Sequence, residues 1–177
     1  MTSAARDAEI AEIDRFLAET KRLQGPHPEW VPSARPSDLE AYWNLEDSLG
    51  IVKAQLRFRC TKVGRMYPTV SLIFRSNPIW RIEIEDPPRP TSGHPNPPWA
   101  YSVGCPALVI GSHEHSWSDN RNYIKHTSEW DIPCRRPIEP QIKKLSQAIP
   151  WFADRIGLKL DHEQRGFDVP PRSELFE

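Results

Sequence analysis

The placement of proline is the feature that most constrains the fold of this chain. The sequence holds 19 prolines in 177 residues, and they concentrate at 26–36, 87–98 and 133–140. Proline has no backbone N–H to donate, and it disrupts helix interiors and central strands. Long helices and paired strands are therefore expected only between these three stretches.

Two segments before residue 50 have the character of helices. Residues 3 to about 23 form the first, because apolar residues such as Ile10, Ile13 and Phe16 recur at spacings of three. A second, short helix is predicted from Ser37-Asp38 onward, carrying Leu39, Tyr42 and Trp43 toward the core.

Three later runs alternate between polar and apolar residues, which is typical of half-buried strands. They cover 51–60, 67–75 and 79–85, and short turns separate them, so an antiparallel meander is predicted. The apolar run 107–110 is a candidate fourth strand. The six prolines within 86–99 predict that this segment is an irregular loop.

The order of these segments predicts one α+β domain over 1–177. Its parts are an N-terminal helix (1–24), a sheet of three to four strands with a long Pro-rich loop (49–116), a closing helix (140–157) that Pro150 kinks or splits, and a polar tail (161–177) with a docked Leu175-Phe176.

Composition limits the cellular compartments and the kinds of partner that are expected for this chain. The formal net charge is −1, so no overall field attracts the chain to nucleic acid or to an anionic membrane. No apolar run approaches the roughly 20 residues that span a bilayer. Three cysteines without a CxxC pair (Cys60, Cys105, Cys134) favour a reducing environment. The sequence therefore predicts a cytoplasmic protein with no membrane partner.

Histidines cluster in the middle of the chain. Four of the six lie between His94 and His126, and His113-Glu114-His115 forms a His-x-His pair. On a strand, both imidazoles of such a pair point to one face and Glu114 points to the other. The alternative interpretation is two polar side chains that bond to their own loop.

His94, His113 and His115 predict a catalytic site. Together with His94 or His126, the pair makes a set of three imidazoles that can bind a catalytic zinc ion. Two imidazoles can instead act as general base and general acid in phosphodiester cleavage without metal. In the metal-free case Arg81, Arg121 or Lys125 is predicted to stabilise the negative charge of the phosphorane. The sequence does not decide whether a metal or another cofactor is used.

Part of this region resembles the TumE-type toxins of bacterial toxin–antitoxin pairs. The resemblance rests on an Arg-x-acid strand (Arg81-Ile82-Glu83), a loop with His94 and Pro95, and the pair His113-Glu114-His115, about forty residues in all. It implies a small cytoplasmic bacterial toxin that acts on RNA and is held by a protein antitoxin.

A second resemblance involves His94-Pro95-Asn96 and Cys105. Ubiquitin-conjugating enzymes carry a similar tripeptide a similar distance before their thioester cysteine. The resemblance implies that Asn96 steadies the loop and the oxyanion while Cys105 carries the modifier. The alternative is a structural turn followed by a buried thiol, because free cysteine is most often a small core residue.

Aromatic and basic residues follow the histidines. Trp117, Arg121, Tyr123 and Lys125 are predicted to bind substrate, because aromatic rings stack on bases and cations hold phosphates. Alternatively, the aromatic residues pad a loop-rich region against the sheet.

Three functions remain open from sequence. The first is a His-centred, toxin-like hydrolase that cleaves RNA, and the second is a conjugating enzyme that uses Cys105. The third is a non-catalytic module that binds a protein, such as an antitoxin, an inhibitor or a defence-system partner, through the aromatic Pro-rich loop.

Overall fold

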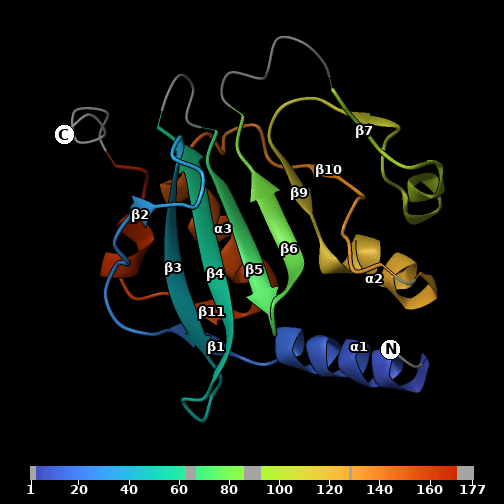
Figure 1. Cartoon of the computed structure of the whole chain (residues 1–177), viewed down its shortest axis with the longest axis horizontal. Coiled ribbons are helices and arrows are strands. Elements are labelled where there is room, and N and C mark those ends of the chain that lie inside the picture. The colour runs from blue at the N-terminus through green and yellow to red at the C-terminus, as the bar shows by residue number, and fades with distance from the viewer. Residues whose placement is uncertain (1–2, 63–66, 86–92, 128, 171–177) are drawn as a thin grey trace.

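The computed structural model describes residues 3–62, 67–85, 93–127 and 129–170. They form a nine-stranded sheet, a separate two-stranded sheet, and helices on one face and at one end (Figure 1). The elements are α1 (Ser3–Ala18), β1 (Lys21–Leu23), β2 (Val31–Pro32), β3 (Asp38–Glu46), β4 (Val52–Thr61), β5 (Thr69–Phe74), β6 (Asn77–Glu83), β7 (His94–Pro95), η1 (Pro98–Val103), β8 (Leu108–Val109), β9 (His113–His115), α2 (Trp117–His126), β10 (Arg136–Pro137), α3 (Leu145–Ile156), β11 (Leu158–Lys159) and η2 (Glu163–Gly166). The predicted α+β class is confirmed.

The large sheet has the order β10-β9-β6-β5-β4-β3-β1-β11, and β2 pairs with β3. Its centre is an antiparallel meander, β3 to β6, which contains the three strands predicted from alternation. The sheet is larger than predicted, because β1, β3, β10 and β11 lie outside the range 49–116.

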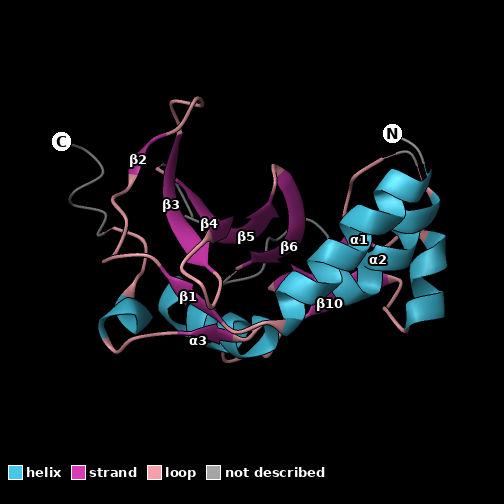
Figure 2. Cartoon of the chain, turned by 90° about the horizontal axis from the view of Figure 1, so that it is seen from below, coloured by secondary structure: helices cyan, strands magenta, loops and turns pink. Residues whose placement is uncertain are grey.

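The core lies on one face of the meander, against α3. Leu56, Leu72 and Ile82 are fully buried there, and the ring of Trp80 meets Phe152 of α3 at 5.7 Å. The opposite face of the meander carries alternating polar residues, and none of the helices in the described part of the chain covers it (Figure 2). This uncovered face borders the candidate site described below.

The predicted short helix from Ser37 is wrong, because these residues begin β3. The side chains of Leu39, Ala41, Trp43 and Leu45 are buried and alternate with polar neighbours. That is the two-residue period of a strand with one face in the core. β3 pairs with β4 along its whole length, which satisfies its backbone hydrogen bonds.

The first helix is shorter than the predicted 1–24. α1 ends at Ala18, and Lys21–Leu23 form β1, which pairs in parallel with β11 and antiparallel with β3. The chain leaves the helix there because Leu23 is buried among the core residues of the sheet. α1 lies beside α2 at the end of the molecule (Figures 1 and 2).

Proline-rich segments contain more regular structure than predicted. In the described part of 86–99, His94 pairs with Val109 and Pro95 with Leu108, so β7 and β8 form a hairpin-like sheet of their own. Pro95 is tolerated because this strand is an edge. The candidate strand 107–110 therefore exists as β8, but it lies outside the large sheet.

The C-terminal part differs in detail from the prediction. α3 begins at Leu145 rather than near residue 140, and it is continuous through Pro150, so proline does not split it. Within the predicted tail, residues 161–170 include η2 and place Phe167 in the core. Leu175-Phe176 lies outside the described residues. Among the described residues, no helix combines the length and hydropathy needed to cross a membrane.

Candidate functional site

Strand β9 brings His113 and His115 to one face of the sheet. The strand is hydrogen-bonded between β6 and β10, and it pairs His115 with Arg81 and His113 with Glu83. Glu114 points to the other face, where its carboxylate accepts a hydrogen bond from Trp80 at 2.8 Å. The side-chain directions predicted for a strand are therefore found.

Both imidazoles are held by main-chain carbonyls. Nδ1 of His113 lies 2.9 Å from the carbonyl oxygen of Gly111, and Nδ1 of His115 lies 2.5 Å from that of Ile132. A carbonyl oxygen can only accept, so each Nδ1 carries the proton. In a neutral ring the Nε2 atom must then present its lone pair. Nε2 of both residues is buried without a hydrogen-bond partner.

Glu83 supplies a carboxylate between these two lone pairs. Its Oε1 atom lies 3.5 Å from Nε2 of His115, and its Oε2 atom lies 3.9 Å from Nε2 of His113. The ligand atoms of the three residues all lie within 4.8 Å of one another. Around one tetrahedral zinc ion, bond lengths of 2.0–2.2 Å place ligand atoms about 3.3–3.6 Å apart. The cluster is thus close to the size that a single ion requires.

The charge states of Glu83, His113 and His115 favour the binding of a cation. Burial lowers the pKa of His113 to about 4, and it also lowers the pKa of His115. Both imidazoles are therefore neutral at neutral pH. Burial opposes ionisation of Glu83, whereas the charge of Arg81 favours it, and the pKa of Glu83 lies below its usual range. The Glu83 carboxylate and the Nε2 lone pairs of His113 and His115 lie close together. Two histidines and one glutamate are the ligands of a known class of zinc sites.

The structure brings the predicted catalytic residues close together. The His94 ring packs on that of His113 with 4.4 Å between centroids, and its Nε2 atom lies 3.1 Å from Glu85. Nε of Arg81 lies 3.4 Å from Glu83. Arg81, His113 and His115 thus all lie beside Glu83, and His94 packs on His113, although the four predicted residues come from three strands.

The residues predicted to bind substrate lie elsewhere, on α2. Trp117 and Arg121 both bond to Asp14 of α1, at 2.8 Å and 2.6 Å, and Lys125 pairs with Asp7 at 3.7 Å. Tyr123 stacks on Trp99 with 4.9 Å between ring centroids. Three of these four side chains therefore join α2 to α1.

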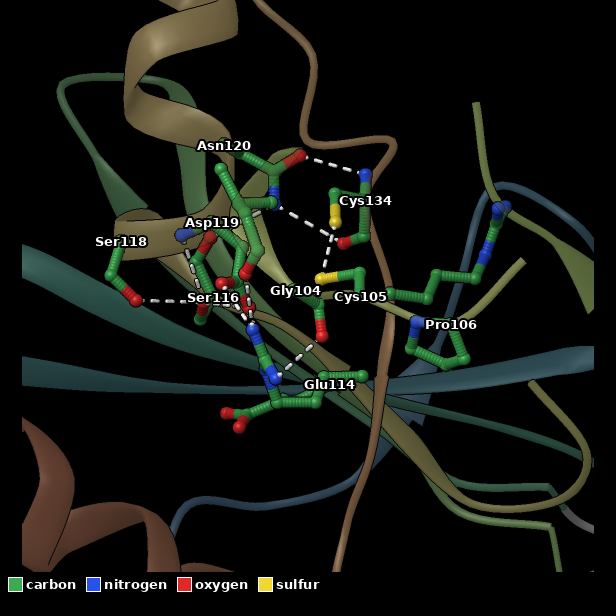
Figure 3. Close-up of polar contacts among 12 residues, drawn as sticks. Gly104, Cys105, Pro106, Glu114, Ser116, Ser118, Asp119, Asn120 and Cys134 are labelled. Carbon is green, nitrogen blue, oxygen red and sulfur yellow. Dashed lines mark hydrogen bonds and ion pairs between the residues drawn. The ribbon is translucent and has the colours of Figure 1, made fainter. Parts of the chain in front are cut away.

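Asn96 and Cys105 are close in space but both are engaged. The Asn96 amide donates to the carbonyls of Pro106 and Arg135 and accepts from the N–H of Arg135, at 2.7 Å each. Cys105 is 3% exposed, and its Sγ lies 2.8 Å from that of Cys134 (Figure 3). Burial raises the pKa of the Cys105 thiol, which disfavours the nucleophilic thiolate.

Sequence reasoning missed Glu83 as a site residue. It was visible only as the acid of the Arg81-Ile82-Glu83 strand motif. Arg81 and Glu83 are two residues apart on β6, as His113 and His115 are on β9, so each pair points to one face of its strand. This spacing identifies Glu83 as a site residue only when β6 and β9 are known to be neighbours.

Comparison with known proteins gives no relationship from which a function could be transferred. No family model matches the chain, and no curated protein or solved structure shows a significant match.

Proposed function

We propose that this protein is a divalent-metal-dependent hydrolase whose ion is bound by Glu83, His113 and His115. The observation that carries the proposal is the pair of buried, partnerless Nε2 atoms aimed at one carboxylate. Two buried imidazole lone pairs that face a carboxylate with no donor between them are electrostatically unfavourable, and a bound cation removes that penalty.

The surroundings of the ligands support the same proposal. Histidines that bind metals usually donate their second ring N–H to a carbonyl or carboxylate, which fixes the tautomer. The carbonyls of Gly111 and Ile132 do this for His113 and His115. When bound, an ion with three protein ligands has a position left for water, whose pKa it lowers toward neutrality.

Two residues next to the ligands have roles in the proposed reaction. Arg81 lies next to the ligand carboxylate and is positioned to hold an anionic group of the substrate. His94, packed on His113 and partly exposed, is the candidate that passes a proton to the leaving group. Phosphodiester cleavage, predicted from the sequence, fits this arrangement of a cation, an anion-binding arginine and a proton donor.

Metal-dependent chemistry fits better than cleavage by His113 and His115 alone. A metal-free mechanism needs one neutral and one protonated imidazole. His113 and His115 are both fully buried, so protonation of either is costly. The conjugating-enzyme and protein-binding functions remain predictions from sequence; buried Cys105 does not favour the first.

The test is metal content and metal-dependent stabilisation. Wild type and Glu83→Gln are purified without chelator, zinc, manganese and iron are measured by elemental analysis, and thermal unfolding is followed with and without added zinc. We expect one ion per wild-type chain and a rise in Tm with zinc that is lost in Glu83→Gln.

Glu46→Gln, in β3 of the same sheet but outside the cluster, is the matched control and should behave as wild type. Equal metal content and equal zinc response in wild type and Glu83→Gln would overturn the proposal. Bound iron in place of zinc would point to oxidative rather than hydrolytic chemistry, because two histidines and one carboxylate also form the iron site of oxygenases.

A further inference from the structure

Two rows of side chains run across the uncovered face of the sheet and end at the histidines. The strand registers place successive residues directly opposite one another across β3, β4, β5, β6 and β9. One row is Tyr42, Arg57, Ser71, Arg81 and His115, and the next is Glu40, Arg59, Thr69, Glu83 and His113. The exposed part of these rows therefore ends at Arg81 and Glu83, directly beside the two buried histidines of the candidate metal centre.

This surface is the floor of a groove of about 750 Å³. Its lining includes Arg57, Arg59, Ser71, Arg81 and Glu83. In Figure 2 the strands β3 to β6 curve around this face, opposite α3. The volume lies within the range of small-molecule sites, roughly 300–1,000 Å³.

The arginines of the groove differ in their partners. Arg59 binds Asp38 through two nitrogens, at 2.9 Å and 2.5 Å, and Arg57 binds Glu40. Among the residues that the structure describes, Arg81 has one carboxylate neighbour, Glu83, at 3.4 Å, and its Nε atom is buried without a hydrogen-bond partner there. A cation bound between Glu83 and the histidines would share that carboxylate, which leaves Arg81 free to bind another anion.

We propose that the groove binds a small phosphate ester, with its phosphoryl group held between the metal centre and Arg81. The remainder of the ligand extends over Ser71 toward Arg57, two strand spacings or about 10 Å from Arg81. Arginine suits this role because its planar fork donates two parallel hydrogen bonds to phosphate oxygens. The inference rests on the proposed function and names its substrate class.

The reaction balances without an additional reagent. A water oxygen forms a bond to phosphorus, the ester P–O bond breaks, and the leaving alkoxide takes a proton. A diester plus water gives a monoester and an alcohol. Arg81 neutralises charge that develops on the non-bridging oxygens.

The charges of the groove favour a small ligand over a long RNA. Nucleic-acid binding depends on several cations that each neutralise a phosphate. Here Glu40 and Asp38 already neutralise Arg57 and Arg59, and the whole chain has a net charge of −1. At the end of the groove beside the metal centre, Arg81 shares its carboxylate neighbour Glu83 with the proposed cation site.

The test compares wild type, Arg81→Gln, Arg81→Lys and the control Arg22→Gln, an exposed arginine on β1. For each protein, zinc stoichiometry is measured first. Binding of inorganic phosphate to the zinc-loaded protein is then measured by calorimetry, and hydrolysis of bis(p-nitrophenyl) phosphate by p-nitrophenolate release. A single-stranded RNA oligonucleotide serves as the second substrate.

We expect all four proteins to bind zinc and Arg22→Gln to match wild type. Arg81→Gln should lower kcat/KM for the diester about 100-fold or more and abolish phosphate binding, with Arg81→Lys between the two. The substrate inference is overturned if zinc-loaded wild type neither binds phosphate nor cleaves the diester, if Arg81→Gln matches wild type, or if only RNA is cleaved. Absence of bound zinc in wild type would instead overturn the proposed function.

Discussion

The two carboxylate oxygens of Glu83 are divided between two histidines on the neighbouring strand, with Oε1 3.5 Å from His115 and Oε2 3.9 Å from His113. The carboxylate of Glu83 can reach both rings because its strand pairs in register with His113. One side chain thus closes a cluster whose other two members lie on β9.

His115→Ala should remove metal binding and also cost stability. The side chain is fully buried, and its loss leaves a cavity and an unpaired Ile132 carbonyl, so we expect a loss of about 1–3 kcal/mol in the free energy of unfolding. Zinc affinity should fall about 100-fold or more. Urea unfolding of the metal-free protein and zinc titration measure the two effects separately.

The control for this variant is His126→Ala, an exposed histidine at the end of α2. It should change neither quantity. A His115→Ala protein that binds zinc as tightly as wild type would remove His115 from the ligand set.

Acid should destabilise the metal-free protein through His113. Burial lowers the pKa of His113 in the folded state to about 4, whereas an unfolded histidine titrates near 6.5. Between these values the unfolded chain binds more protons, so stability falls as the pH falls. Glu83, His115 and His94 are the titratable groups that face this ring.

Urea unfolding in EDTA at pH 7, 6 and 5 measures this linkage. Wild type should lose about 2 kcal/mol more than His113→Ala over this range. Parallel pH profiles for the two proteins would show that His113 is not held neutral by the fold.

Lys21→Met should be strongly destabilising, although it lies far from the histidines. The Lys21 ammonium is buried and donates to the carbonyls of Leu17, Glu19 and Ile156, at 3.2, 2.5 and 2.6 Å. These carbonyls lie at the ends of α1 and α3, where helices leave acceptors unsatisfied. We expect a loss of about 2–4 kcal/mol by urea unfolding.

Lys159→Met, on the exposed side of β11, is the matched control and should cost about 0.5 kcal/mol or less. A loss of that small size in Lys21→Met would mean that water replaces the ammonium at these carbonyls.

Cys105 should react slowly with thiol reagents in the native protein. Its side chain is buried against Cys134 and burial raises its pKa, so little thiolate is exposed at neutral pH. Labelling with iodoacetamide, followed by mass spectrometry, should modify Cys105 only after unfolding. Rapid, selective native labelling of Cys105 would instead favour the conjugating-enzyme prediction.

The sequence by itself determined the elements whose pattern is local. Alternation defined β4, β5 and β6, helical spacing defined most of α1, and the His-x-His spacing placed His113 and His115 on one face of a strand. Each of these follows from the two- or 3.6-residue period of a single element.

Only the tertiary structure decided which elements meet. The segment from Ser37 becomes a strand because β4 supplies its hydrogen-bond partners, and Trp117 and Arg121 turn to Asp14 because α1 packs beside α2. Glu83 joins the histidines because β9 pairs with β6, and their burial follows from that packing. Periodicity fixes the direction of a side chain within its own element, whereas its partners and its charge state depend on contacts between residues that are distant in sequence.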